Sequence, residues 1–178
     1  MNVSSTIYLE NFLALAKKNA NGPRNYAGVV RLDGENEKMV WTDGYVILTA
    51  PYRGETKTIT HLGMEANLTY PKYEGVLPDE EKGIPSKSGL SSNLLMCLGT
   101  QKGRDPNLFL GFNKVSHDVS ISSIPSEEDK VFNPFLAART LKGFLAMNIP
   151  ITTILNDNML TLKIGFLQCN LVSIEKAV

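Results

Sequence analysis

Two amphipathic helices, each followed by short strands, dominate the pattern of this sequence and restrict the folds open to it. The first helix is expected over Thr6–Asn19, where apolar residues recur at helical spacing and Asn21-Gly22-Pro23 supplies a stop signal. The second is expected over Pro134–Met147, because Asn133 is placed as its N-cap and proline occupies its first position. Two helices of this kind each need a sheet or a partner helix to cover their apolar faces.

The segments that follow each helix have the composition of strands, with Gly, Asn and Asp at the turns between them. After the first helix they are Tyr26–Asp33, Lys38–Asp43 and Tyr45–Tyr52, and after the second they are Ile151–Leu155, Met159–Ile164 and Phe166–Ile174. Further strands are expected at Thr56–His61, Leu94–Leu98, Leu108–Phe112 and Val119–Ile124. The pattern therefore predicts an α+β fold, with two helices packed on antiparallel sheets in a two-fold internal repeat.

The length of 178 residues fits one domain over 1–178. Within it, we expect a first repeat over about residues 4–65, a connecting segment over about 66–104 and a second repeat over about 105–178. No basic or apolar leader is visible at the start of the sequence, and no apolar run is long enough to span a membrane. These features predict a cytoplasmic protein.

The 18 basic and 18 acidic residues give a formal net charge of zero, which excludes a histone-like polycation and an acidic tail. Phosphate binding depends on where the charges lie, and five basic residues fall on or just beyond the outward faces of the two helices. They are Lys17, Lys18, Arg24, Arg139 and Lys142. If the helices share one side of a sheet, this surface could contact phosphates. The alternative is a pair of ordinary solvated helix faces.

No concentrated catalytic or metal site is visible in the sequence. His61 and His117 each stand without a second ligand at metal-binding spacing, and no phosphate-binding or nucleophile motif occurs. Cys97 and Cys169 lie in apolar stretches and are expected to be reduced and buried. We therefore expect a protein that is not an enzyme, with no catalytic residues, no metal and no cofactor.

Three segments resemble motifs of the bacterial beta sliding clamp, the processivity subunit of DNA polymerase III. The first, Thr42–Ile47 (TDGYVI), is similar to the TDGHRL strand and turn of that family. The second, Tyr70–Pro78 (YPKYEGVLP), is similar to its (F/Y)PDYRRVLP stretch, and the third, Val131–Lys142 (VFNPFLAARTLK), to its FNPxYLxxxLK helix start. Together the three motifs favour a DNA-clamp fold.

The resemblance implies two binding functions. In the family, helices face duplex DNA, so the five basic residues above would contact its phosphate backbone, and a single domain would need a homo-oligomer to encircle DNA. The family also docks short peptides of replication proteins in an apolar pocket. By motif position, the candidates for that pocket here are Thr42, Gly44, Tyr45, Val46, Ile47, Pro71 and Val76. The alternative for these residues is a plain hairpin packed on the core.

The sequence also departs from the family pattern. Tyr45 and Val46 replace the His and Arg of TDGHRL, and Glu74-Gly75 replaces the two arginines of the second motif, so the polar rim of the pocket is missing. The chain is about half the usual length. These differences indicate a reduced, divergent clamp from a bacterium or a phage. A protein-interaction module of clamp-like fold, which modulates a replication partner without binding DNA, is the alternative.

Overall fold

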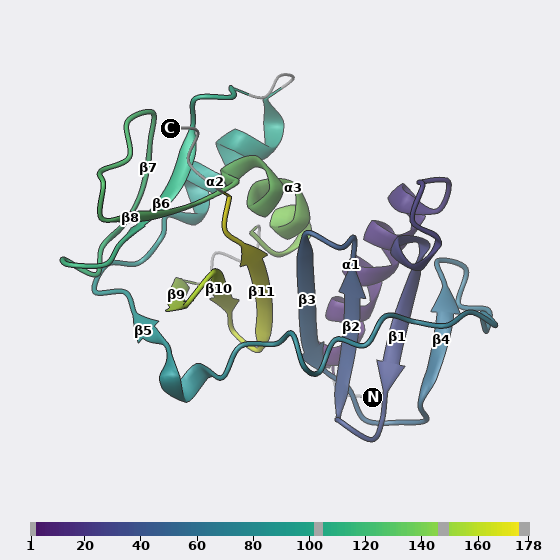
Figure 1. Ribbon diagram of the computed structural model, residues 1–178. Helices are drawn as coiled ribbons and strands as arrows, with labels where there is room; N and C mark the ends of the chain where they lie inside the picture. The colour runs from purple at the N-terminus through teal and green to yellow at the C-terminus, as the bar shows by residue number, and fades with distance from the viewer. Residues whose placement is uncertain (1–2, 102–104, 146–149, 175–178) are drawn as a thin grey trace. The chain divides into compact units, whose positions relative to one another are not determined.

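The computed structural model describes residues 3–101, 105–145 and 150–174 (Figure 1). This part of the chain forms three α-helices and antiparallel sheets, so the predicted α+β class is confirmed. The chain clusters into two compact units. Residues 1–77 and 166–168 form the first, and residues 78–165 and 169–178 form the second.

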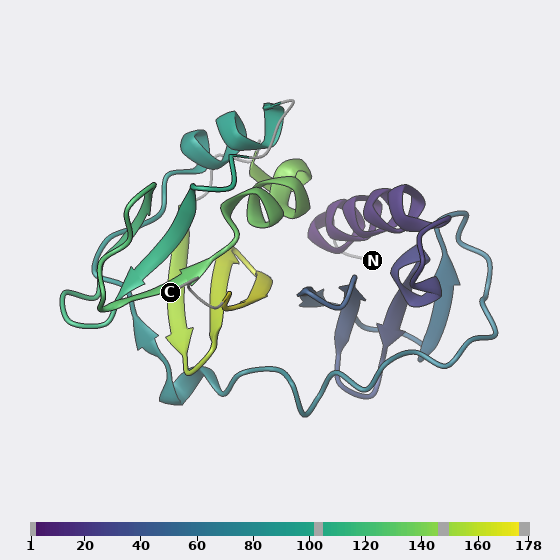
Figure 2. The same cartoon turned by 45° about the horizontal axis from the view of Figure 1, so that its top comes forward.

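The first unit packs helix α1 (Val3–Asn19) on one face of four antiparallel strands (Figures 1 and 2). A short 3-10 helix, η1 (Asn25–Gly28), connects α1 to the first strand. The strands lie in the spatial order β4-β1-β2-β3. Their bounds are β1 (Val29–Asp33), β2 (Lys38–Thr42), β3 (Val46–Pro51) and β4 (Lys57–Thr60).

The core of the first unit lies between α1 and the sheet. Tyr8, Phe12 and Ala16 recur every four residues along α1 and are buried, as the helical spacing requires for one apolar face. Trp41 of β2 is 2% exposed, and its indole N–H donates a hydrogen bond of 2.9 Å to the carbonyl of Ala27 in η1. This bond satisfies the buried polar atom of the ring and ties β2 to η1.

Within the described residues, the second unit contains two α-helices, six complete strands and residues 169–172 of β11. The strands β7-β6-β8 form a three-stranded sheet, and β11-β10-β9-β5 lie side by side in another. The helical elements are η2 (Glu80–Lys82), α2 (Ser92–Thr100) and α3 (Pro134–Leu145). The strands are β5 (Ile84–Pro85), β6 (Phe109–Asn113), β7 (Val119–Ser122), β8 (Asp129–Phe132), β9 (Ile151–Asn156), β10 (Met159–Ile164) and β11 (Leu167–Val172).

Helix α3 confirms the start and the apolar face predicted for the second helix. The side chain of Asn133 accepts hydrogen bonds from the amides of Phe135 and Leu136 at 3.1 and 3.0 Å, which is N-cap geometry. The apolar positions along one side of the helix are all buried: Ala137, Ala138, Leu141, Phe144 and Leu145. The predicted end at Met147 lies outside the described residues, because the structure leaves out 146–149.

The prediction of a strand at Leu94–Leu98 is wrong, because these residues lie in helix α2. The side chain of Ser91 caps this helix by accepting a hydrogen bond from the amide of Leu94, and Leu95 and Leu98, three positions apart, form its buried face. A short apolar run without alternation fits either element, and the cap decides for the helix. Cys97 is consequently exposed on the outer side of α2 rather than buried, whereas Cys169 is buried as expected.

The described residues therefore form three α-helices where two were expected. Of the other predicted strands, Met159–Ile164 has its predicted bounds and the rest are present with shifted ends. Two strands were not predicted: β5, which is two residues long, and β8, whose first residues are the charged pair Asp129-Lys130. The two-fold repeat and its boundaries stay predictions.

Candidate functional site

The predicted basic residues on the two helices are exposed, in each unit separately. Lys17 and Lys18 lie in the last turn of α1, in the first unit, where a positive charge also stabilises the helix dipole. Arg139 and Lys142 lie on the exposed side of α3, in the second unit, and the Nε of Arg139 donates to the carbonyl of Phe135 at 3.2 Å. Each pair is thus available to solvent on its own helix.

Arg24, the fifth predicted phosphate contact, lies against the turn at Thr42–Val46 (here the TDG turn). Its Nη1 donates a hydrogen bond to the carbonyl of Asp43, and its Cζ atom lies 4.4 Å from the centre of the Tyr45 ring. This distance is that of a cation–π contact. Arg24 therefore connects the segment after α1 to the TDG turn.

Hydrogen bonds within the TDG turn fix its shape. The hydroxyl of Thr42 donates to the carbonyl of Val46 at 2.8 Å and accepts from the amide of Gly44 at 3.0 Å. One carboxylate oxygen of Asp43 accepts from the amides of Tyr45 and Val46 at 2.9 and 3.1 Å. Gly44 has a φ of 90°, a conformation that a side chain would strain. A Cβ there would also lie 2.8 Å from the hydroxyl oxygen of Tyr26 and collide with the Arg24 guanidinium.

The candidate pocket residues of the TDG turn differ strongly in exposure. Thr42 and Val46 are buried in the first unit, and Ile47 is half-buried. The Tyr45 side chain is 61% exposed and stands out from the surface. The turn itself therefore presents an aromatic ring with a guanidinium against it.

The second motif lies on the face of the first-unit sheet opposite α1. Residues 66–77, here called the crossing segment, run across this face after β4 (Figures 1 and 2). The hydroxyl of Tyr70 donates to the carbonyl of Val40 in β2 at 3.2 Å. The hydroxyl of Tyr73 donates to the carboxylate of Asp33 at the end of β1, a bond that is buried. Two tyrosines thus hold the segment against β1 and β2.

These contacts shift the pKa values of three buried groups. Burial alone would raise the pKa of Asp33, but hydrogen bonds from Asn36 and Tyr73 and the charge of Arg31 outweigh it and hold this pKa below its usual value. Burial raises the pKa of Tyr70. Burial and the bond to Asp33 raise the pKa of Tyr73. At neutral pH, both tyrosines are therefore hydrogen-bond donors, and Asp33 is an acceptor that carries a charge.

The crossing segment brings the other two pocket candidates to this same unit. Pro71 follows the anchored Tyr70 and is half-buried, whereas Val76 is 51% exposed. The Tyr70 hydroxyl bonds to Val40, two positions before Thr42 in β2, so the second motif reaches the strand that leads into the TDG turn. Sequence reasoning missed Tyr26 and Asp33. Their partners lie far away in the sequence, so no local pattern marks them.

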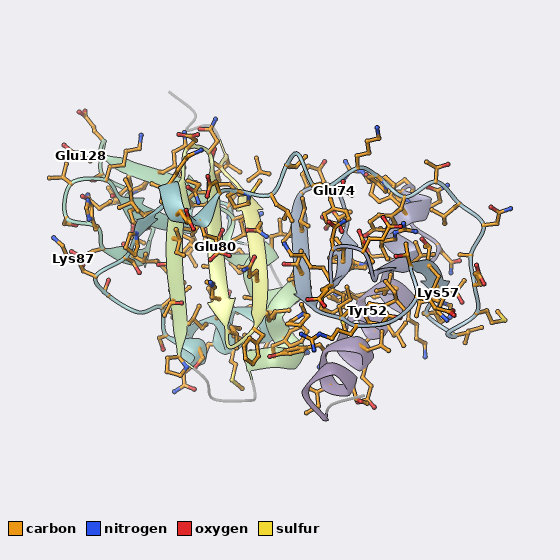
Figure 3. All side chains as sticks on the ribbon, turned by 90° about the horizontal axis from the view of Figure 1, so that it is seen from below. Tyr52, Lys57, Glu74, Glu80, Lys87 and Glu128 are labelled. Atoms are coloured by element: carbon orange, nitrogen blue, oxygen red, sulfur yellow. The ribbon has the colours of Figure 1, made fainter. Side chains whose placement is uncertain are left out.

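Two acidic segments, Asp79–Glu81 and Glu127–Asp129, take part in local ion pairs and hydrogen bonds. Glu80 of η2 lies over the strands of the second unit (Figure 3), and its carboxylate is 2.6 Å from the Nζ of Lys163 in β10. Asp79 caps η2 by accepting from the amide of Glu81 and lies 3.0 Å from Lys82. Asp129 accepts bonds from the side chains of Asn113 and Ser126. These acidic side chains therefore stabilise local structure.

Among residues 3–101, 105–145 and 150–174, no three His, Cys, Asp or Glu side chains lie close enough together to hold a metal ion. In the same part of the chain, every helix is too short or too polar to cross a bilayer.

Comparison with solved structures identifies the fold. The beta subunit of DNA polymerase III from Pseudomonas aeruginosa matches 95% of this chain with a TM-score of 0.61 at 10% identity. The beta clamp of Helicobacter pylori, solved with a DNA ligase peptide, matches 97% with a TM-score of 0.62 at 9% identity. The chain has a sliding-clamp fold. The sliding clamp of Bartonella birtlesii, solved with griselimycin, agrees, with a TM-score of 0.61 over 98% of this chain at 12% identity.

The chain spans slightly less than two thirds of these sliding clamps, 64% of the Pseudomonas and Bartonella proteins and 63% of the Helicobacter protein. No protein-family model and no curated protein sequence matches it. The likeness to sliding clamps is therefore one of fold, at an identity that fits the divergence noted in the motifs.

Proposed function

We propose that this chain is a non-enzymatic, sliding-clamp-like protein of DNA replication or recombination in a bacterial cell or a phage-infected host. It binds double-stranded DNA through phosphates, with Lys17, Lys18, Arg24, Arg139 and Lys142 as contacts, and works as a homo-oligomer in the cytoplasm. The observation that supports this proposal is the combination of a sliding-clamp fold with exposed basic residues on both α1 and α3.

The charge distribution fits such a protein. Contacts to phosphates are blind to sequence and weaken with added salt, because each one releases a condensed counterion. A clamp that slides needs contacts that are few and weak. Two exposed cations on each helix, with a net charge of zero for the chain, meet this requirement better than an intense basic patch would.

The test is binding of a fluorescent 30-base-pair duplex to the full chain at 50 and 150 mM salt. We expect the double variant Lys17→Glu with Lys142→Glu to bind at least tenfold more weakly. The matched control, Lys72→Glu with Lys87→Glu, changes the charge equally at two exposed lysines elsewhere and should bind like the parent. Native mass spectrometry gives the oligomeric state. A strict monomer without duplex affinity at low salt would contradict the proposal.

Docking of a short peptide is a second candidate, with Thr42, Gly44, Tyr45, Val46, Ile47, Pro71 and Val76 as the contact residues. It is supported by the position of the second motif, whose Tyr70 hydroxyl bonds to Val40 in β2, the strand that leads into the TDG turn. The probe is the DNA ligase peptide of the kind bound to the Helicobacter pylori clamp. We expect Val76→Asp to abolish its binding, and Val115→Asp, at another exposed valine, to leave it intact. Peptide binding without duplex binding would favour an interaction module.

A further inference from the structure

The Arg24–Tyr45 pair is a surface feature that neither the helix faces nor an apolar pocket accounts for. The guanidinium lies over the Tyr45 ring, with Cζ 4.4 Å from its centre, and one of its N–H groups bonds to the carbonyl of Asp43. A guanidinium has five N–H donors, so others stay available for a ligand. Tyr45 is 61% exposed despite the stacked guanidinium, so much of the residue is in contact with solvent.

The turn beneath the pair is already ordered by its own hydrogen bonds. Thr42 and Asp43 together bind the amides of Gly44, Tyr45 and Val46 and the carbonyl of Val46. Tyr45 therefore projects from a backbone of fixed shape. When a ligand stacks on Tyr45, the protein loses little conformational entropy, because the turn is already ordered.

We propose that the Arg24–Tyr45 pair binds single-stranded DNA by stacking one unpaired base on the Tyr45 ring, with Arg24 supplying positive charge for the adjacent phosphate. Aromatic rings beside cations are how proteins hold single strands without reading their sequence, because every base offers a π-face. Lys17 and Lys18 add two exposed cations near the end of α1, seven and six residues before Arg24 in the chain.

The exposure of the neighbouring residues favours a base over an apolar peptide side chain. An apolar anchor needs a pocket whose walls it can bury. Thr42 and Val46, the walls nearest to Tyr45 in the chain, are buried within the protein and offer no such surface. The carboxylate of Asp43 already accepts two amide hydrogen bonds, so its charge is partly balanced. What remains for a ligand is a ring and a cation.

The experiment measures binding of a fluorescent dT15 strand and a 15-base-pair duplex to the full chain by anisotropy. We expect Tyr45→Leu, which keeps apolar bulk but removes the ring, to weaken dT15 binding roughly fivefold or more and duplex binding less than twofold. Tyr45→Phe keeps the ring and should stay within twofold of the parent for dT15. Arg24→Gln should also weaken dT15 binding, and the slope of log affinity against log salt concentration should become shallower by about 0.7.

Three results would overturn the inference, provided that circular dichroism shows each variant folded. If Tyr45→Leu binds dT15 with unchanged affinity, no base stacks on the Tyr45 ring. If Tyr45→Leu loses equal affinity for dT15 and for the duplex, Tyr45 has a general structural role and not a stacking role. Loss of DNA ligase peptide binding in Tyr45→Leu, with dT15 binding intact, assigns the pair to a peptide.

The inference deepens the proposed DNA-binding function, yet the two fail separately. Lys17→Glu with Lys142→Glu tests duplex binding by the helices, whereas Tyr45→Leu tests stacking at the TDG turn. Binding of dT15 that depends on Tyr45, in a chain without duplex affinity, would reject the clamp-like function and keep the stacking site. If duplex binding depends on Lys17 and Lys142 but dT15 binding does not depend on Tyr45, the clamp-like function would be kept and the stacking site rejected.

Discussion

Most hydrogen bonds of the TDG turn join its own residues, with one further bond from Arg24, whereas Tyr70 and Tyr73 attach the crossing segment at residues 66–77 to strands β2 and β1. In the turn, Thr42 and Asp43 bind backbone groups no more than four positions away. In the crossing segment, Tyr73 bonds to Asp33 and Tyr70 to Val40, 40 and 30 positions away. The two motifs of the sequence are therefore stabilised by different ranges of interaction.

This difference predicts how each region responds to mutation. A turn built from local bonds keeps its shape when distant contacts are lost, and it fails only when its own backbone is strained. A segment held by distant side chains is released when one of those partners is removed, even though its own residues are unchanged. Variants in the two regions should therefore differ in how much unfolding free energy they lose and in whether trypsin cleaves the crossing segment faster.

The largest effect is expected for Asp33→Ala, which removes the buried acceptor of the Tyr73 hydroxyl and of two Asn36 hydrogen bonds. Buried donors left without partners should cost about 3 kcal/mol of unfolding free energy, measured by urea denaturation. Trypsin should also cleave faster after Lys72, because the crossing segment loses an anchor. Asp118→Ala, at an exposed aspartate, is the control and should change neither. An unchanged cleavage rate would mean that Tyr73 does not hold the segment.

A smaller effect is expected for Gly44→Ala in the turn. Its φ of 90° strains a residue with a side chain, at about 1–2 kcal/mol, and the Arg24 guanidinium must move away from the added methyl group. Gly75→Ala, where a Cβ meets nothing within 4 Å, should change stability by less than about 0.5 kcal/mol. In an Arg24→Ala background the part of the cost that comes from the guanidinium should vanish, whereas the close contact with the Tyr26 hydroxyl remains. Cleavage after Lys72 should stay at the parent rate.

The smallest effect is the dependence of stability on pH through Asp33. Its folded pKa lies below the unfolded value of about 3.9, so its contribution is fully present above that value and is lost as pH falls through the folded pKa. The stability difference between the parent and Asp33→Asn should therefore be constant from neutral pH to about pH 5 and shrink below about pH 4. The difference between the parent and Gly44→Ala should not vary with pH. A gap that widens on acidification would contradict the direction assigned to Asp33.

Local signals made much of the fold predictable from the sequence. The Asn133 cap, the proline after it and the spacing of Ala137, Ala138 and Leu141 specify α3 without reference to the rest of the chain. Helix α2 was missed because its apolar run suits a strand as well, and only the Ser91 cap distinguishes the two. Strand β8 was missed because its partner β6 supplies the signal, and that partner is remote in sequence.

The candidate site was predictable to the same extent. The TDG turn follows from its own residues, so its shape could be expected. The stacking of Arg24 on Tyr45 depends on where the chain after α1 meets β2, and the buried bond between Tyr73 and Asp33 depends on the path of the crossing segment. Neither contact leaves a local trace, because the partners are far apart in the sequence and set by tertiary packing.

Trp41 has a practical consequence for studying the two units apart. It is the single tryptophan of the chain, it is buried in the first unit, and its indole N–H is bonded to the carbonyl of Ala27. Fluorescence excited at the red edge of indole absorption therefore reports unfolding of the first unit alone, whereas far-ultraviolet circular dichroism reports both. Coincident transitions by the two signals would show that the units unfold cooperatively, and separated transitions would assign one stability to each.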